Sequence, residues 1–182
     1  MPASDEARYI GVIRDPKDVF VSSYFFIKDS VYGPAMWSVD TWYRSFVSGV
    51  NFMEMSCPVA TASYWRQRHR PNVLLLSFKQ MKRDLEGTVR RIAAFLDIDA
   101  PEAVIQDVVR QSSFEYMRGI DHKFNVGRIV PWQEPGRMMR KGMQGGSSEL
   151  LSPDRQREAD TYCQRELERL GCGDLPYGDF AD

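Results

Sequence analysis

The segment Tyr9-Ile-Gly-Val-Ile-Arg-Asp-Pro-Lys-Asp-Val-Phe-Val-Ser-Ser-Tyr24 is an apolar run that stops at a basic residue and then becomes amphipathic. It predicts a buried strand over Tyr9–Ile13, a turn, and a helix that Asp15 caps and Pro16 begins. Arg14 lies between the two, and a cation beside the free N–H groups of a helix start is suited to hold a phosphate. Ser22 follows Asp15 by two helical turns, so its hydroxyl can reach the same anion.

A second basic segment, Arg137-Met-Met-Arg-Lys-Gly-Met-Gln-Gly-Gly146, follows far downstream. Its glycines let the main chain approach an anion, and the adjacent Arg140 and Lys141 supply charge-assisted hydrogen bonds. From residue 118 to residue 141 the chain carries six basic and two acidic residues. This local excess of positive charge suits a small polyanionic ligand better than a nucleic acid duplex.

The two segments resemble parts of the cytosolic sulfotransferases, which transfer a sulfuryl group from 3′-phosphoadenosine 5′-phosphosulfate (PAPS) to an acceptor. In that family an Arg-x-Pro-Lys-Asp-x-x-x-Ser pattern binds the 3′-phosphate, and the first segment fits it from Arg14 to Ser22. The second resembles the closing loop Arg-Lys-Gly-x-x-Gly, which completes that phosphate site. The resemblance implies that PAPS, or its product 3′-phosphoadenosine 5′-phosphate (PAP), binds to these residues: Arg14, Ser22, Met138, Met139, Arg140, Lys141 and the Gly142 amide.

Two weaker matches lie between these segments. The stretch Val73-Leu-Leu-Leu-Ser-Phe-Lys-Gln-Met-Lys82 resembles the family's strand and helix start, with Phe78 where a tyrosine contacts the nucleotide. The stretch Ser112-Ser-Phe-Glu-Tyr-Met117 resembles a Thr-Ser-Phe-x-x-Met segment that packs against adenine. The resemblance therefore implies that Phe78, Ser112, Ser113, Phe114 and Met117 frame the adenosine. Taken alone, Phe114 and Met117 indicate only the buried face of a short helix.

Two parts of the family's machinery have no counterpart in this sequence: the phosphate loop Pro-Lys-Ser-Gly-Thr-Thr-Trp and the catalytic histidine upstream of the first strand. His69 lies in a basic turn and His122 lies in the loop before the closing motif, so no catalytic residue is assigned. We therefore expect the isolated chain to bind the nucleotide without turnover. The family's dimerisation stretch is also unmatched, with Pro153 at its valine position.

The predicted fold is α/β, a partial P-loop NTPase-like sulfotransferase fold with a parallel sheet core and mostly helical surroundings. Two uniformly apolar runs, Tyr9–Ile13 and 73–78, are the predicted strands and should be covered on both faces. Because two strands make a poor sheet, we expect a single domain over 1–182 that lacks its amino-terminal part. We expect its free sheet edge to pair with a second copy or another chain.

The remaining segments predict helices. They are expected over 37–47, 58–68, 79–96, 101–110 and 154–170, with a bend at Gly49, a long loop over 119–146 and a stop at Gly171. The aromatic side chains of the first two helices, Trp37, Trp42, Tyr43, Phe46, Tyr64 and Trp65, are predicted to be core residues.

Composition narrows the class of protein. The 182 residues are 43% hydrophobic, which is enough for one packed core, and 24 basic against 25 acidic residues argue against general nucleic acid binding. Three cysteines with no metal-binding spacing indicate a reducing cytoplasm and no metal site. No apolar stretch is long enough to span a membrane.

These observations support three functions. The first is a sulfotransferase that acts on a hydroxyl or amine of a small-molecule acceptor, in which positioning and charge stabilisation supply most of the rate. The second is a non-catalytic PAP- or PAPS-binding module or pseudoenzyme, because part of the family's machinery is unmatched. The third is a structural interaction protein that pairs through its sheet edge and needs no nucleotide.

Overall fold

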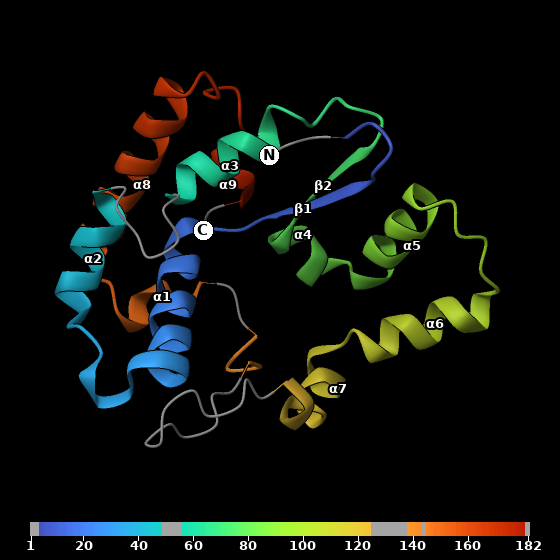
Figure 1. The fold of residues 1–182 in the computed structure, drawn as a ribbon, viewed down its shortest axis with the longest axis horizontal. Coiled ribbons are helices and arrows are strands. Elements are labelled where there is room, and N and C mark those ends of the chain that lie inside the picture. Colours follow the sequence, from blue (N-terminus) through green and yellow to red (C-terminus); the bar gives the residue numbers. More distant parts are fainter. Residues whose placement is uncertain (1–3, 49–55, 125–137, 143–144, 181–182) are drawn as a thin grey trace.

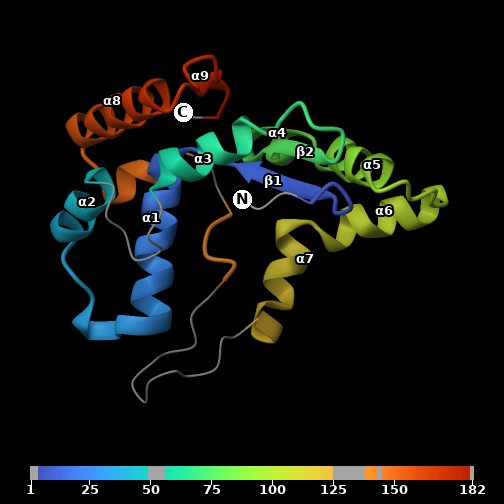
Figure 2. The ribbon, with the colours of Figure 1, turned by 45° about the horizontal axis from the view of Figure 1, so that its top comes forward.

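The computed structural model describes residues 4–48, 56–124, 138–142 and 145–180. Its centre is a parallel pair of strands, β1 (Tyr9–Ile13) and β2 (Val73–Ser77), aligned from Tyr9 opposite Val73 to Ile13 opposite Ser77. In Figure 1 and Figure 2, α1, α2 and α8 gather on one side of the sheet and α5, α6 and α7 on the other. The predicted α/β fold with mostly helical surroundings is confirmed.

The turn after β1 forms as the sequence predicts. Asp15 accepts a hydrogen bond from the Lys17 amide at 2.8 Å, and Pro16 is the first residue of α1 (Pro16–Ile27). The other side of α1 buries Phe20, Val21 and Tyr24 in the largest core cluster, together with Trp42, Tyr43, Leu151 and Ala159. The Asp15 cap therefore sets where α1 begins, and its buried side chains hold the helix against the core.

The helices that follow begin at capping serines. After η1 (Lys28–Tyr32) and η2 (Gly33–Ala35), Ser38 caps α2 (Val39–Val47), so the helix predicted over 37–47 starts two residues later. Ser56 caps α3 (Cys57–Trp65), which replaces the helix predicted over 58–68. The predicted bend at Gly49 lies outside the described residues.

The prediction of one long helix over 79–96 is wrong. The chain forms α4 (Phe78–Arg83) and α5 (Leu85–Phe95), separated by Asp84 at φ −140° and ψ 80°. The Asp84 carboxylate accepts the Gly87 amide at 2.7 Å and so caps a new helix. Phe78 begins α4 instead of ending the strand, because Ser77 caps that helix.

The carboxyl-terminal half continues with α6 (Glu102–Gln111), α7 (Phe114–Gly119), η3 (Asp121–Phe124), η4 (Gly146–Glu149), α8 (Pro153–Arg169) and α9 (Tyr177–Phe180). The long loop predicted over 119–146 contains η3, and part of it lies outside the described residues. Helix α8 ends as predicted before Gly171, whose φ is +71°. After that turn, Cys172 and Leu175 pack with Leu167 and Ala62 in a second core cluster.

The apolar strands predicted a sheet covered on both faces, and this prediction is wrong for β1. Gly11 and Ile13 are buried, but the alternate side chains of β1 are open, with Ile10 41% exposed and Val12 44% exposed. Among the described residues, no helix combines the length and the apolar character needed to cross a lipid bilayer.

Candidate functional site

Arg14 lies at the junction where β1 ends and α1 begins. Its guanidinium stacks on Phe78, with 4.5 Å between Cζ and the ring centroid, and its Nη2 lies 3.5 Å from Asp18 Oδ2. Its Nε is buried and has no hydrogen-bond partner among the described residues. Leaving a buried donor unpaired costs about 1–3 kcal/mol, so Nε marks a place where an acceptor atom of a ligand would fit.

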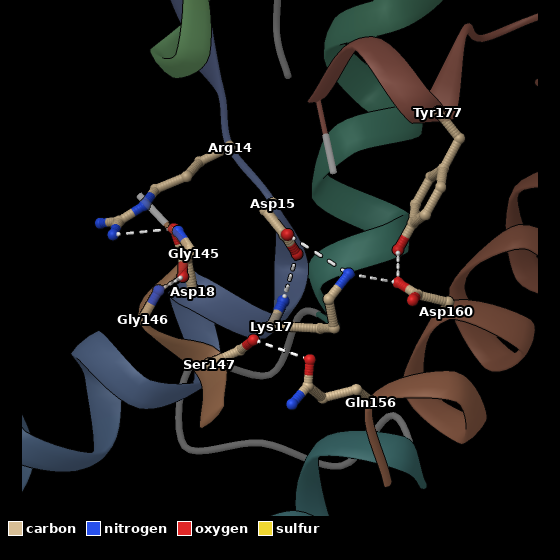
Figure 3. Close-up of polar contacts among 10 residues, drawn as sticks. All are labelled: Arg14, Asp15, Lys17, Asp18, Gly145, Gly146, Ser147, Gln156, Asp160 and Tyr177. Carbon is tan, nitrogen blue, oxygen red and sulfur yellow. Dashed lines mark hydrogen bonds and ion pairs between the residues drawn. The ribbon is translucent and has the colours of Figure 1, made fainter. Parts of the chain in front are cut away.

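Asp18 joins this junction to the glycine-rich segment. Its buried carboxylate accepts the amide of Gly145 at 3.2 Å and the amide of Gly146 at 3.0 Å, and Figure 3 shows both glycines beside Arg14. Gly145 has a φ of +68°, a left-handed conformation that glycine adopts without strain. The main chain after the Arg-Lys-Gly motif is thus held against the first turn of α1.

The two cations of that motif share one carboxylate. Arg140 Nη1 donates to both carboxylate oxygens of Glu149 at 2.9 Å, and Lys141 Nζ lies 2.9 Å from Glu149 Oε2. Burial alone would raise the pKa of Glu149, but the bonds from Lys141 and Arg140 outweigh it and hold that pKa below its ordinary value. The Arg140 guanidinium also stacks on Phe25 of α1, 4.2 Å from the ring centroid.

The aromatic side chain of Phe114 packs against the main chain of the Arg-Lys-Gly motif at Gly142. Gly142 has a φ of +61°, and a Cβ built there would lie 2.2 Å from Phe114 Cδ2. The Phe114 ring therefore packs directly on the loop main chain, and only glycine fits at this position. Lys82 Nζ lies 5.7 Å from the centroid of the same ring.

These groups line one cavity of about 710 Å³. Its walls contain every residue predicted for the cofactor site except Ser113: Arg14, Ser22, Phe78, Ser112, Phe114, Met117, Met138, Met139, Arg140, Lys141 and Gly142. Ser113 instead caps α7, where its hydroxyl accepts the Tyr116 amide at 3.2 Å. The structure thus brings together segments that are more than a hundred residues apart.

Several residues that were not predicted for the site also line this cavity: Asp18, Val21, Lys82, Gly145, Gly146, Ser148 and Glu149. Two of them carried a usable signal. Lys82 follows Phe78 by four residues, the spacing of neighbours on one helix face, and Asp18 follows Arg14 by the same number of residues across the predicted helix start. No local sequence signal pointed to Glu149, because its ion pairs with Arg140 and Lys141 depend on how the glycine-rich turn folds back.

An apolar cavity of about 500 Å³ adjoins the first, and Arg14 lines both. It lies among β1, α1, α2 and α3, and its walls include Phe26, Trp42, Phe46 and Tyr64. Trp42 and Tyr43 are buried, as predicted, but Trp37 is 44% exposed and is not a core residue. Some of the predicted core aromatics therefore also form the wall of a cavity.

Behind the junction lies a buried charge network, drawn in Figure 3. Lys17 is 1% exposed, and its Nζ lies 2.6 Å from Asp160 Oδ1 and 3.2 Å from Asp15 Oδ2. The Tyr177 hydroxyl donates to the same Asp160 oxygen at 3.0 Å. Burial alone would lower the pKa of Lys17, but the bond to Asp160 and the charge of Asp15 outweigh it and the pKa is raised. Helices α1, α8 and α9 are thereby joined beneath the site.

Neither histidine reaches these cavities. His69 and His122 are both exposed, and neither is among the residues that line the two cavities described above. Within the described part of the chain, the larger cavity is lined by basic side chains, the carboxylates of Asp18 and Glu149 that pair with some of them, hydroxyls, glycine main chain, thioethers and aromatic rings. Such a set binds and orients an anionic, partly aromatic ligand.

Comparison with known proteins gives consistent matches. A family model described as a sulfotransferase domain matches residues 2–171. The luciferin sulfotransferase of Photinus pyralis is 34% identical over 145 residues, which are 74% of this chain and 37% of that protein. Sulfotransferase 2A1 of Macaca fascicularis is 27% identical over 170 residues, which are 92% of this chain and 59% of that protein. The chain thus spans less than two thirds of either relative.

Solved structures share the fold. Mouse sulfotransferase SULT7A1 in complex with PAP superposes with a TM-score of 0.76 at 22% identity, over 92% of this chain and 60% of that one. Retinol dehydratase in complex with retinol and PAP also gives 0.76 at 22% identity, over 90% and 48% of the two chains. At this identity the structural likeness concerns the fold alone.

Proposed function

Because this chain belongs to the sulfotransferase family, whose domain model matches residues 2–171, we propose that it binds the 3′-phosphate and adenosine of PAPS or PAP in the cavity at Arg14. The observation that carries the proposal is the buried Nε of Arg14, which has no hydrogen-bond partner in the part of the chain that the structure describes and lies in the same cavity as Arg140 and Lys141. Three cations around one cavity fit a phosphate dianion. The PAP complexes of the structural relatives support the same ligand.

Each wall suits a part of that nucleotide. Arg14, Arg140 and Lys141 supply positive charge, and the Ser22 hydroxyl and the Gly142 amide are neutral donors for the same phosphate. The rings of Phe78 and Phe114 and the thioether of Met117 offer apolar surface to a flat base. Ser112, Met138 and Met139 line the same cavity, whereas Ser113 acts as a helix cap. PAPS, when bound, supplies the sulfuryl group, and these residues bind and orient it.

We propose that this chain supplies the 3′-phosphate and adenosine part of a site for sulfuryl transfer to a hydroxyl or amine of a small-molecule acceptor. In this reaction a sulfur–oxygen bond of the donor breaks, a bond from sulfur to the acceptor oxygen or nitrogen forms, and the acceptor loses a proton. The apolar cavity that shares Arg14 with the nucleotide cavity supports an acceptor with a largely apolar body. The relative named a luciferin sulfotransferase supports a small-molecule acceptor.

We propose further that this 182-residue chain binds the nucleotide without turning it over. Both histidines are exposed and lie outside the walls of the two cavities. An assay with labelled PAPS and a panel of phenols, alcohols and amines tests this, and we expect no transfer above the background rate. Robust turnover that disappears in His122→Ala would contradict the proposal and assign that histidine as the base.

Binding is tested by calorimetry that compares PAP with adenosine 5′-phosphate, which lacks the 3′-phosphate. We expect PAP to bind more tightly, and Arg14→Ala to remove about 1.5–3 kcal/mol of that binding while leaving adenosine 5′-phosphate unaffected. Arg157→Ala is the matched control, because Arg157 is exposed and pairs with Asp154 on α8. Equal affinity of the unmodified chain for both nucleotides would contradict the assignment of this cavity as a 3′-phosphate site.

We also propose that the free edge of the sheet, together with the exposed side chains of β1, is covered by association with a second copy or another chain. The exposure of Ile10 and Val12 on β1, a strand that pairs with β2 alone among the described residues, supports this. For the compartment we propose the cytoplasm, which the three free cysteines support. Fractionation of cells that express the tagged chain tests the location.

A further inference from the structure

The Glu149 carboxylate lies where Arg140 and Lys141 would otherwise contact a ligand. Its two oxygens accept three close contacts, all at 2.9 Å: two from Arg140 Nη1 and one from Lys141 Nζ. A carboxylate bound in this way presents two oxygens and one negative charge to the cations, as part of a phosphate would. The side chain comes from the short turn η4 and lines the same cavity as Arg14.

The second carboxylate of the cavity is held differently. Asp18 is 3% exposed and its oxygens accept the amides of Gly145 and Gly146, so it is tied to the main chain. The Glu149 side chain is 27% exposed, and among the described residues its hydrogen bonds go to Arg140 and Lys141. Glu149 can therefore leave the cations for water by a change of its own side chain, whereas Asp18 cannot move without the loop.

We propose that Glu149 is an internal counter-ion that occupies the 3′-phosphate position of the cavity and that the nucleotide displaces it. The inference rests on the proposed function, because it concerns the same cations. Displacement trades two partly exposed ion pairs for new ones, so only part of the attraction between phosphate and the cations appears as affinity. Glu149 thereby determines how strongly the site distinguishes nucleotides with a 3′-phosphate from those without it.

Glu149 remains available as a competitor at neutral pH. The groups that face it are Arg140, whose guanidinium is also stacked on Phe25, and Lys141. Burial by itself would raise the pKa of Glu149, but the bonds from these two cations lower it. The carboxylate is therefore ionised at neutral pH, as a nucleotide phosphate is, and the two anions compete for the same pair of cations.

The test compares Glu149→Gln and Glu149→Ala with the unmodified chain, after circular dichroism has verified that each is folded. Inorganic phosphate is titrated while the backbone amide signals of Lys141 and Gly142 are followed by NMR, and PAP and adenosine 5′-phosphate are titrated by calorimetry. The matched control is Glu86→Gln, the same change at a carboxylate that accepts bonds from Arg90 on α5, outside the cavity walls.

We expect both Glu149 variants to bind inorganic phosphate and PAP roughly 3- to 10-fold more tightly, the combined effect of losing two partly exposed ion pairs. Adenosine 5′-phosphate binding and the control should not change. Unchanged or weaker phosphate binding in both variants would overturn the inference, since Glu149 would then be a bystander or a group that positions the cations. If the phosphate result holds but PAP binds no better than adenosine 5′-phosphate in any variant, the proposed function fails, and what stands is that Glu149 is a counter-ion that a phosphate displaces.

Discussion

Gly146 donates its amide to Asp18 Oδ1 at 3.0 Å, a hydrogen bond between residues that are 128 positions apart in the chain. With the parallel bond from Gly145, it holds the glycine-rich turn against the first turn of α1. Arg140 and Lys141 precede this turn, and Arg14 precedes the helix. The position of three cations around one cavity thus depends on a single buried carboxylate.

Replacing that carboxylate tests the dependence. Asp18→Ala leaves the amides of Gly145 and Gly146 without their acceptor, and we expect a loss of about 2–3 kcal/mol in the free energy of unfolding. PAP binding should weaken by roughly tenfold or more, because the loop cations lose their anchor. Urea denaturation and calorimetry measure the two effects. Asp29→Ala on η1 is the control, and an Asp18→Ala chain of unchanged stability would show that the turn does not need this bond.

Gly142→Ala should block the loop. The added methyl would lie 2.2 Å from Phe114 Cδ2, and the φ of +61° is strained for alanine. We expect weaker PAP binding and a destabilisation of about 1–3 kcal/mol. Gly119→Ala provides the comparison, since nothing lies within 4 Å of a Cβ at Gly119. Equal behaviour of the two variants in thermal unfolding and calorimetry would argue against the close approach of Phe114.

The buried Lys17 network has a defined pH dependence. Lys17→Met leaves Asp15 and Asp160 without their shared cation, which should cost about 3–5 kcal/mol at neutral pH. Because the pKa of Lys17 is raised above 10.5 in the folded chain, its contribution is fully present below 10.5 and is lost as pH rises through the raised value. Urea denaturation at about pH 8 and about pH 11 should show the difference between the two chains shrinking at the higher pH. Lys123→Met, at an exposed residue, should show no such trend.

The open side of the sheet should make the chain associate. Light scattering over a concentration series should give a mass that rises above that of the monomer, and Ile10→Lys should reduce the association by placing a charge on the exposed face. Val104→Lys changes a comparably exposed side chain on α6 and serves as control. A monomer at all concentrations, with strong hydrogen-exchange protection of Tyr9–Ile13, would contradict the proposed association.

Local chemistry explains which parts of the fold were predictable. The cap at Asp15, the helix start at Pro16 and the stop at Gly171 depend on neighbouring residues, and all three agree with the structure. The break at Asp84 was missed because the apolar spacing continues through it, while the capping bond to Gly87 interrupts the helix. Periodicity reports which face is apolar and does not report where a side chain replaces a main-chain hydrogen bond.

The cavity was partly predictable for a related reason. Its segments could be identified by resemblance, but the contacts that assemble them come from residues without a motif, such as Glu149. Ser113 shows a local use of such a segment, because its hydroxyl caps helix α7 and its side chain is not among the cavity walls. Pairing between distant segments depends on tertiary packing, which no local pattern encodes.

The contact between Lys17 and Asp160 also sets an order of events during synthesis. Helix α1 leaves the ribosome before α8, so Lys17 first emerges without the Asp160 carboxylate that lies 2.6 Å from it in the folded chain. Tyr177, the hydroxyl partner of Asp160, emerges later still. The nascent chain therefore cannot complete the base of the site until Asp160 and Tyr177 have both left the exit tunnel.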